Sequence, residues 1–62
     1  MRIYTIDSKN KQKVLDNAEA VRLAGSKEKL DFMIEEAQEI YADDPLTCIE
    51  FLVADGRIGF EF

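Results

Sequence analysis

The sequence has no histidine and no tryptophan, and it contains only one cysteine and one proline. A single cysteine, Cys48, cannot form an internal disulfide, and without histidine the common zinc sites cannot be completed. Cys48 also has no basic neighbour in sequence to activate its thiol, so we expect a small, partly buried apolar residue. The chain must be held by packing alone, and we expect neither a metal nor a cofactor.

Long apolar runs are also missing. Residues 1–6 lack the apolar run of a signal peptide, and no segment approaches the length of a membrane span. With 47% hydrophobic residues in 62 positions, the composition is typical of one folded domain, residues 1–62, rather than of a disordered acidic tail. We expect a cytoplasmic protein with no membrane partner.

Positive charge is scarce in the second half of the chain. Residues 1–29 hold seven Lys/Arg and four Asp/Glu, whereas residues 30–62 hold one Arg and nine acids. The net charges of +3 and −8 sum to the −5 of the whole chain. Such an asymmetry bears on partners and solubility rather than on fold.

The clearest predicted element is a helix over residues 27–42. Ser26 is a good N-cap, Gly25 interrupts the preceding segment, and Pro45 disfavours helix at the residue before it. Apolar residues recur at helical spacing within this range: Leu30, Met33, Ile34, Ala37, Ile40 and Tyr41. They form one stripe, which we expect to face the core.

The last fifteen residues predict a β-hairpin with strands 48–54 and 57–62. Asp55 and Gly56 are the typical pair of a two-residue type I′ turn. This turn predicts the following pairs: Ala54 opposite Arg57, Val53 opposite Ile58, Phe51 opposite Phe60 and Ile49 opposite Phe62. Because the apolar pairs agree with the turn, one apolar face of the hairpin should receive the helix.

The same register places Glu50 directly opposite Glu61 on the other face. Opposed carboxylates are mildly destabilising, so we expect Arg2 or Arg22 to neutralise this secondary acidic pair from a neighbouring strand. Two carboxylates can divide acid and base roles only in a pocket that separates their pKa values, and so small a domain has little volume for one. Two ligands are also too few for a divalent cation. We expect no enzymatic activity.

The first 25 residues leave two alternatives. Residues 2–6 predict a strand, 9–12 a polar turn and 13–15 a short extended piece. Residues 19–24 alternate in a way that favours a further strand, because the apolar residues of this region scatter around a helical wheel. The predicted fold is α+β, with one main helix packed on a small antiparallel sheet that includes the hairpin. The alternative makes residues 9–23 helical, in a β-α-α-β-β order.

Residues 17–37 carry a resemblance to a known class of proteins. The run Asn17-Ala18-Glu19-Ala20-Val21-Arg22-Leu23-Ala24-Gly25-Ser26-Lys27-Glu28-Lys29-Leu30 combines an expected strand, a Gly-Ser closure and a capped helix with glutamate and leucine in its first turns. This pattern resembles small immunity proteins of bacterial polymorphic-toxin systems. The resemblance implies a non-enzymatic acidic α+β domain that neutralises another protein by binding it, and it assigns no functional residue.

The helix face opposite the apolar stripe is acidic. Its members are Glu28, Asp31, Glu35, Glu36, Glu39 and Asp43, with Phe32 in their midst. Charged outward faces are ordinary solvated surface, but an aromatic side chain ringed by charges is also the composition of a binding hot spot. Burial of Phe32 under the preceding segment or in a homodimer is the alternative. We take these seven residues as the candidate partner-binding site.

The basic cluster Lys9, Lys11 and Lys13 gives only weak evidence of a phosphate-binding surface, because the chain has a net charge of −5. No aromatic residue is interleaved with these lysines for base stacking, so we expect no direct contact with nucleic acid.

These observations favour a protein that binds and inhibits another protein with a basic surface, such as a toxin, a nuclease or a defence effector. It would act as an immunity-type or phage anti-defence inhibitor, with its acids mimicking nucleic acid where the target binds one. The alternative is an assembly module that forms a homodimer through the hairpin edge, with Leu52 and Cys48 on its outer face. A small-molecule binder is disfavoured, because no polar residues converge.

Overall fold

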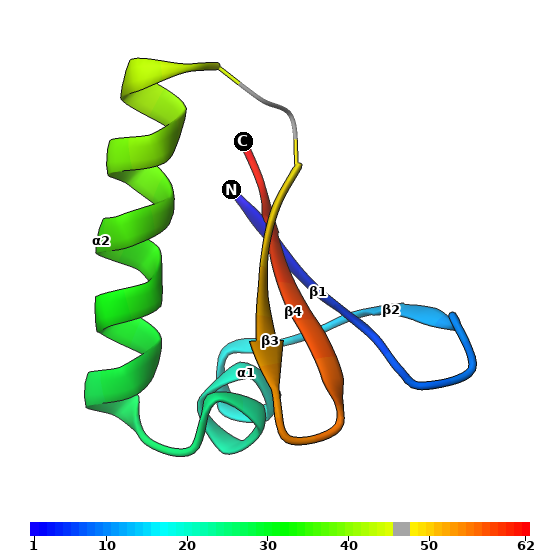
Figure 1. The fold of residues 1–62 in the computed structure, drawn as a ribbon. Coiled ribbons are helices and arrows are strands. Elements are labelled where there is room, and N and C mark those ends of the chain that lie inside the picture. The colour runs from blue at the N-terminus through cyan, green and yellow to red at the C-terminus, as the bar shows by residue number, and fades with distance from the viewer. Residues whose placement is uncertain (46–47) are drawn as a thin grey trace.

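The computed structural model describes residues 1–45 and 48–62. Within these residues the chain forms four strands and two helices, shown in Figure 1. In chain order they are β1 (Arg2–Ile6), β2 (Gln12–Val14), α1 (Asn17–Ala24), α2 (Lys27–Asp43), β3 (Cys48–Val53) and β4 (Gly56–Glu61).

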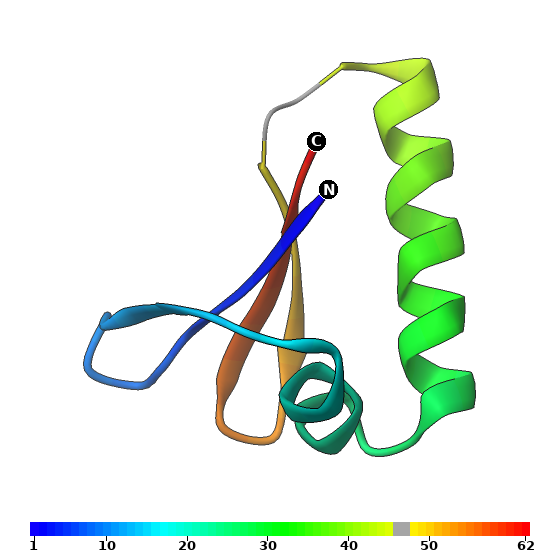
Figure 2. The ribbon, with the colours of Figure 1, turned by 180° about the vertical axis from the view of Figure 1, so that it is seen from behind.

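The strands form one antiparallel sheet in the order β2-β1-β4-β3. Both helices lie on the same side of this sheet, and the two views in Figures 1 and 2 show the N- and C-terminal residues side by side. The predicted α+β class is therefore confirmed. The described residues form two layers, and none of their helices lies on the outer face of the sheet.

The core lies between the helices and the inner face of β4. Ile58 and Phe60 on this central strand are fully buried, and Leu30 of α2 is 2% exposed. Ala20 of α1 and Ala37 of α2 are also fully buried. Because alanine is small, these two positions let both helices approach the sheet closely.

Helix α2 is confirmed close to its predicted bounds. The Ser26 hydroxyl accepts a hydrogen bond from the Lys29 N–H at 3.1 Å, and Asp44 is the C-cap. Near its last turn, the ring of Tyr41 stacks on Phe62 with 4.7 Å between centroids. The capping oxygen and Pro45 acted as the sequence indicated. The apolar stripe faces the core in the first part of the helix, whereas its last members, Ile40 and Tyr41, are exposed.

The strand predicted over residues 19–24 is wrong, because this segment lies in helix α1. Asp16 and Glu19 form a capping box: the Asp16 carboxylate accepts from the Glu19 N–H at 2.8 Å, and the Glu19 carboxylate accepts from the Asp16 N–H at 3.3 Å. Gly25 closes the helix with φ 110°. The alternative of one helix over residues 9–23 is also wrong at its start, because β2 occupies residues 12–14, close to the predicted extended piece.

The hairpin is present, but its predicted register is wrong by two residues. Val53 pairs with Gly56 and Ile49 with Phe60. A type I′ turn needs positive φ at both central residues; here Gly56 has φ 100°, and Asp55 is not among the described residues with positive φ. A single left-handed glycine is typical of the longer hairpin loop with a bulge. Since the shift is even, the predicted inner and outer faces are preserved.

Tyr4 covers the outer face of β4. It lies opposite Gly59, where an added Cβ would overlap the Tyr4 ring, so only glycine fits there. The Tyr4 hydroxyl donates to a Glu50 carboxylate oxygen at 2.9 Å, and the residue is 2% exposed. Burial, together with the neighbouring Cys48 and Glu50 side chains, holds the pKa of Tyr4 well above its usual value.

The capping box predicts how α1 responds to substitution. Replacing Asp16 with alanine should lower the free energy of unfolding by about 1 kcal/mol, because an N-terminal N–H of α1 loses its acceptor. Asp16→Asn keeps an acceptor and should stay within a few tenths of a kcal/mol of the wild type. Urea denaturation followed by circular dichroism measures both. Equal stability of Asp16→Ala and the wild type would show that α1 does not depend on this cap.

The Tyr4 contact predicts a pH dependence. Tyr4→Phe should lower the free energy of unfolding by about 1–2 kcal/mol at neutral pH, because a hydrogen bond to a charged acceptor is lost. The folded pKa of Tyr4 is raised, so the unfolded chain, whose tyrosines ionise near pH 10, loses this proton first. The contribution of Tyr4 is therefore complete below about pH 10 and is lost as the pH rises above it.

Urea denaturation at about pH 9 and about pH 11 measures this slope. The wild type should lose more stability over this interval than Tyr4→Phe. Tyr41→Phe is the matched control, because it removes the other tyrosine and leaves Tyr4 in place. An unchanged slope in Tyr4→Phe would exclude the buried phenol as its source.

Candidate functional site

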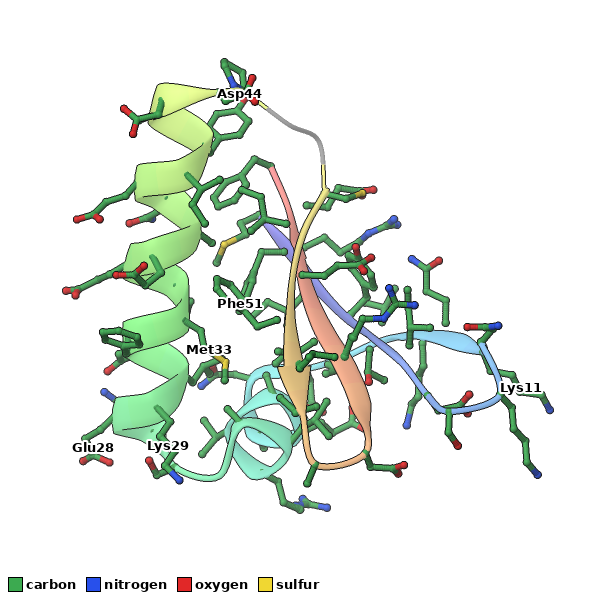
Figure 3. The ribbon with its side chains drawn as sticks, viewed as in Figure 1. Lys11, Glu28, Lys29, Met33, Asp44 and Phe51 are labelled. Atoms are coloured by element: carbon green, nitrogen blue, oxygen red, sulfur yellow. The ribbon has the colours of Figure 1, made fainter. Side chains whose placement is uncertain are left out.

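An open groove of about 430 Å³ lies between the first half of α2 and strand β3. Its lining side chains are Glu28, Lys29, Phe32, Met33, Phe51 and Leu52. Figure 3 shows Met33 and Phe51 in the space between the two elements, with Glu28 and Lys29 at the first turn of α2. The groove is therefore apolar within, and both of its charged residues come from the start of the helix.

Two strongly exposed apolar side chains meet at this groove. Phe32 is 61% exposed and Leu52 is 84% exposed. The sequence suggested Phe32 for an inhibitor surface and Leu52 for a dimer surface, and the structure brings both residues to one place. Phe32 is not buried under the preceding segment. Exposed apolar side chains that cluster around a hollow are typical of interaction sites.

The acidic face of α2 consists of two neighbouring rows. One row contains Glu28 and Glu36, each four positions from Phe32 and therefore beside it on the helix surface. The other row contains Asp31, Glu35, Glu39 and Asp43. Of these acids, only Glu28 lines the groove. Of the seven predicted residues, the groove thus contains Glu28 and Phe32, and the other five lie on the acidic face of α2 outside its lining.

Most of these acids make no ion pair with another described residue. Among the described residues, the ion pair on α2 joins the Lys27 ammonium to the Asp31 carboxylate at 3.3 Å. Lys29, the cation that lines the groove, lies with its side chain against Gly25. Its aliphatic part covers apolar surface while its ammonium group lies at the junction of the helices. The middle of α2 therefore presents its negative charge to solvent.

The hairpin acids are compensated within the molecule. An Arg2 nitrogen lies 2.7 Å from a Glu61 oxygen, and an Arg57 nitrogen lies 3.0 Å from a Glu50 oxygen. The predicted pairing of Glu50 with Glu61 is wrong, because the corrected register places them opposite Gly59 and Cys48. Of the two candidate arginines, Arg2 neutralises Glu61; Arg57 was missed because the predicted register placed it further from Glu50.

Cys48 differs from its expected burial. It is exposed at the start of β3, and its sulfur lies 3.9 Å from a Glu61 carboxylate oxygen. The cause is its position: β3 is an edge strand, and Cys48 points to the outer face of the sheet, which no helix covers.

The basic cluster lies at the other end of the molecule. Lys11 is at the far end of the β1–β2 loop in Figure 3. The Lys13 ammonium donates to a Glu19 carboxylate oxygen at 2.8 Å, and this contact raises the pKa of Lys13 and lowers that of Glu19. This lysine thus serves as a partner for the chain's own acid and connects β2 to α1.

In the described part of the chain, no helix is both long enough and apolar enough to cross a membrane. Comparisons of this chain with protein-family models, with curated proteins and with solved structures find no match.

Proposed function

We propose that this protein is a non-enzymatic inhibitor that binds another protein through the groove between α2 and β3. The target presents a basic surface with at least one protruding apolar side chain. A toxin, a nuclease or a defence effector has the required charge where it binds nucleic acid. This proposal keeps the inhibitor function suggested by the sequence and moves its centre from the acidic helix face to the groove.

The observation that carries the proposal is the meeting of Phe32 and Leu52 at one hollow beside the acidic face of α2. Interfaces concentrate their binding energy in a few desolvated apolar and aromatic anchors, and polar residues around these anchors exclude water. Phe32 supplies the aromatic anchor, while Met33 and Phe51 form the floor of the hollow. Glu28 and Lys29 supply the charged lining, and Glu36 lies one turn along the helix from Phe32.

The outer acidic row contributes mainly to the rate of association. Exposed charges of one sign attract an oppositely charged partner over about 10 Å at 0.1 M salt, and this attraction weakens as salt increases. The acids of the hairpin take no part, since Arg2 and Arg57 already pair with them.

The test compares matched variants in capture and inhibition. The immobilised protein is incubated with lysate of its source cell, and retained proteins are identified by mass spectrometry and purified. Phe32→Ala with Glu35→Lys should weaken binding of the target by about 100-fold, because an interface anchor and a steering charge are lost together. Calorimetry measures the affinity, and the activity of the purified target measures inhibition.

The control is Val14→Ala, which removes an apolar side chain of similar exposure, 53%, on β2. It should bind and inhibit as the wild type does. Circular dichroism should show that all variants are folded, because Phe32 is largely exposed and contributes little to the core. The proposed surface is wrong if the double variant binds the target with unchanged affinity, and the inhibitor function is wrong if the bound target stays fully active.

A homodimer is the second candidate, and one observation favours it. β3 is an edge strand whose Leu52 is 84% exposed, and free strand edges pair readily with one another. Light scattering of the purified protein should then show a dimer that Leu52→Lys separates into monomers. A monomer at every concentration excludes this candidate.

A further inference from the structure

The groove and the free edge of β3 form one continuous feature, from which we infer how the partner is bound. We propose that an extended basic segment of the partner adds to the sheet as a fifth strand along β3. Its apolar side chains alternate with lysine or arginine and enter the groove beside Phe32. This inference rests on the proposed function and adds the partner's conformation and sequence pattern.

The lining of the groove places it over the backbone edge of β3. Successive residues of a strand point to opposite faces. Phe51 points to the core face, where its ring packs edge-on against Phe60 with 5.9 Å between the ring centroids. Leu52 points to the outer face. Both nevertheless line the same hollow. The hollow must therefore pass across the edge of the strand between them, where an incoming chain would lie.

This edge has unused hydrogen-bonding groups. β3 pairs with β4 on one side and is the last strand of the sheet, so every second N–H and C=O along it points away from the sheet. An added strand lies about 4.8 Å beyond β3 and can bond to these groups. Its inward side chains would then face Met33 and Phe32 on α2.

The two edges of the sheet differ in the features that prevent strand addition. β2, at the other edge, has three residues, with Lys13 in the strand and Lys11 directly before it. Short strands and lysines are the common protections of a sheet edge. β3 has six residues and a single charged one, Glu50, which is already bound by Arg57 and Tyr4. Of the two edge strands in the described residues, β3 is the one without these protections.

The negative charge of α2 favours a basic partner over a second copy of this chain. Glu28 lines the groove together with Lys29, whose side chain lies against Gly25, and Glu36 lies one turn along the helix from Phe32 on the acidic face of α2. A basic segment complements these carboxylates, whereas two copies paired through β3 would bring two acidic α2 helices together. The chain's own basic strand, β2, spans three residues and would leave half of β3 unpaired.

The test uses synthetic peptides of about seven residues, a common strand length. The first alternates lysine with valine and leucine; a second has the same composition with lysines and apolar residues in separate blocks. Two further peptides repeat the first with N-methyl groups on one or the other alternate set of backbone amides. Nuclear magnetic resonance of the labelled protein follows the amides of β3, and titration gives the affinities.

The alternating peptide should shift the β3 amide signals and slow the hydrogen exchange of every second one. The block peptide should bind at least about tenfold more weakly, and only one of the two N-methylated peptides should lose binding, because one set of amides faces β3. Phe32→Ser should weaken the alternating peptide about tenfold, and the matched Val14→Ser should have no effect.

Several results would overturn the inference. Equal binding of the alternating and block peptides would show that charge alone attracts them. Protected β3 amides in a dimer without peptide would show that a second copy occupies the edge. If the captured target depends on Phe32 but no peptide contacts β3, strand addition is wrong and the proposed function stands. If neither the target nor any peptide depends on Phe32, both proposals fail.

Discussion

The pairing of β1 with β4 is the contact on which the rest of the molecule depends. Arg2 lies opposite Glu61 and Thr5 opposite Ile58, so this pairing closes a loop of almost the whole chain at a considerable cost in conformational entropy. Complete burial of Ile58 and Phe60 under both helices offsets that cost. Without this closure, β1–β2 and β3–β4 would be separate two-stranded hairpins, which are marginal in water. The sheet, the helix positions and the groove all follow from it.

A chain of 62 residues supplies enough helix to cover one face of this sheet. The outer face is satisfied differently: the Tyr4 ring covers Gly59, its hydroxyl binds Glu50, and two arginine–carboxylate pairs join neighbouring strands. Exposed ion pairs each contribute little to stability. Here their effect is that the charges of the hairpin acids are balanced by arginines of the same molecule. Within residues 1–45 and 48–62, no side chain covers the edge of β3 and the adjacent part of α2 in this way. The surface left open is therefore apolar and hydrogen-bonding, and it lies beside the acidic face of α2.

The acidic residues of the second half of the chain fall into two groups, one paired within the sheet and one exposed on α2. Acids of the hairpin pair with arginines of the sheet, whereas most acids of α2 face solvent without an ion pair among the described residues. Exposure of Phe32 could be predicted from its position opposite the apolar stripe. Its neighbour Leu52 could be predicted to lie on the outer face of the hairpin. That the two side chains share one groove required the tertiary structure, because they belong to elements with no fixed relation in sequence.

Local chemistry in the sequence by itself determined α2, the existence of the hairpin and the two faces of that hairpin, because a cap, a stripe, a proline and an alternating pattern act over a few residues. The start of α1 is equally local, because Asp16 and Glu19 have the spacing of a capping box. The apolar pattern around it is obscured by Val14, which belongs to β2. Tertiary structure decided the rest. The φ of Gly56 set the hairpin register, the long-range closure chose β4 as the partner of β1, and the twist and order of the sheet left β3 at an open edge. These outcomes depend on which distant surfaces can be buried together, and no short segment encodes that choice.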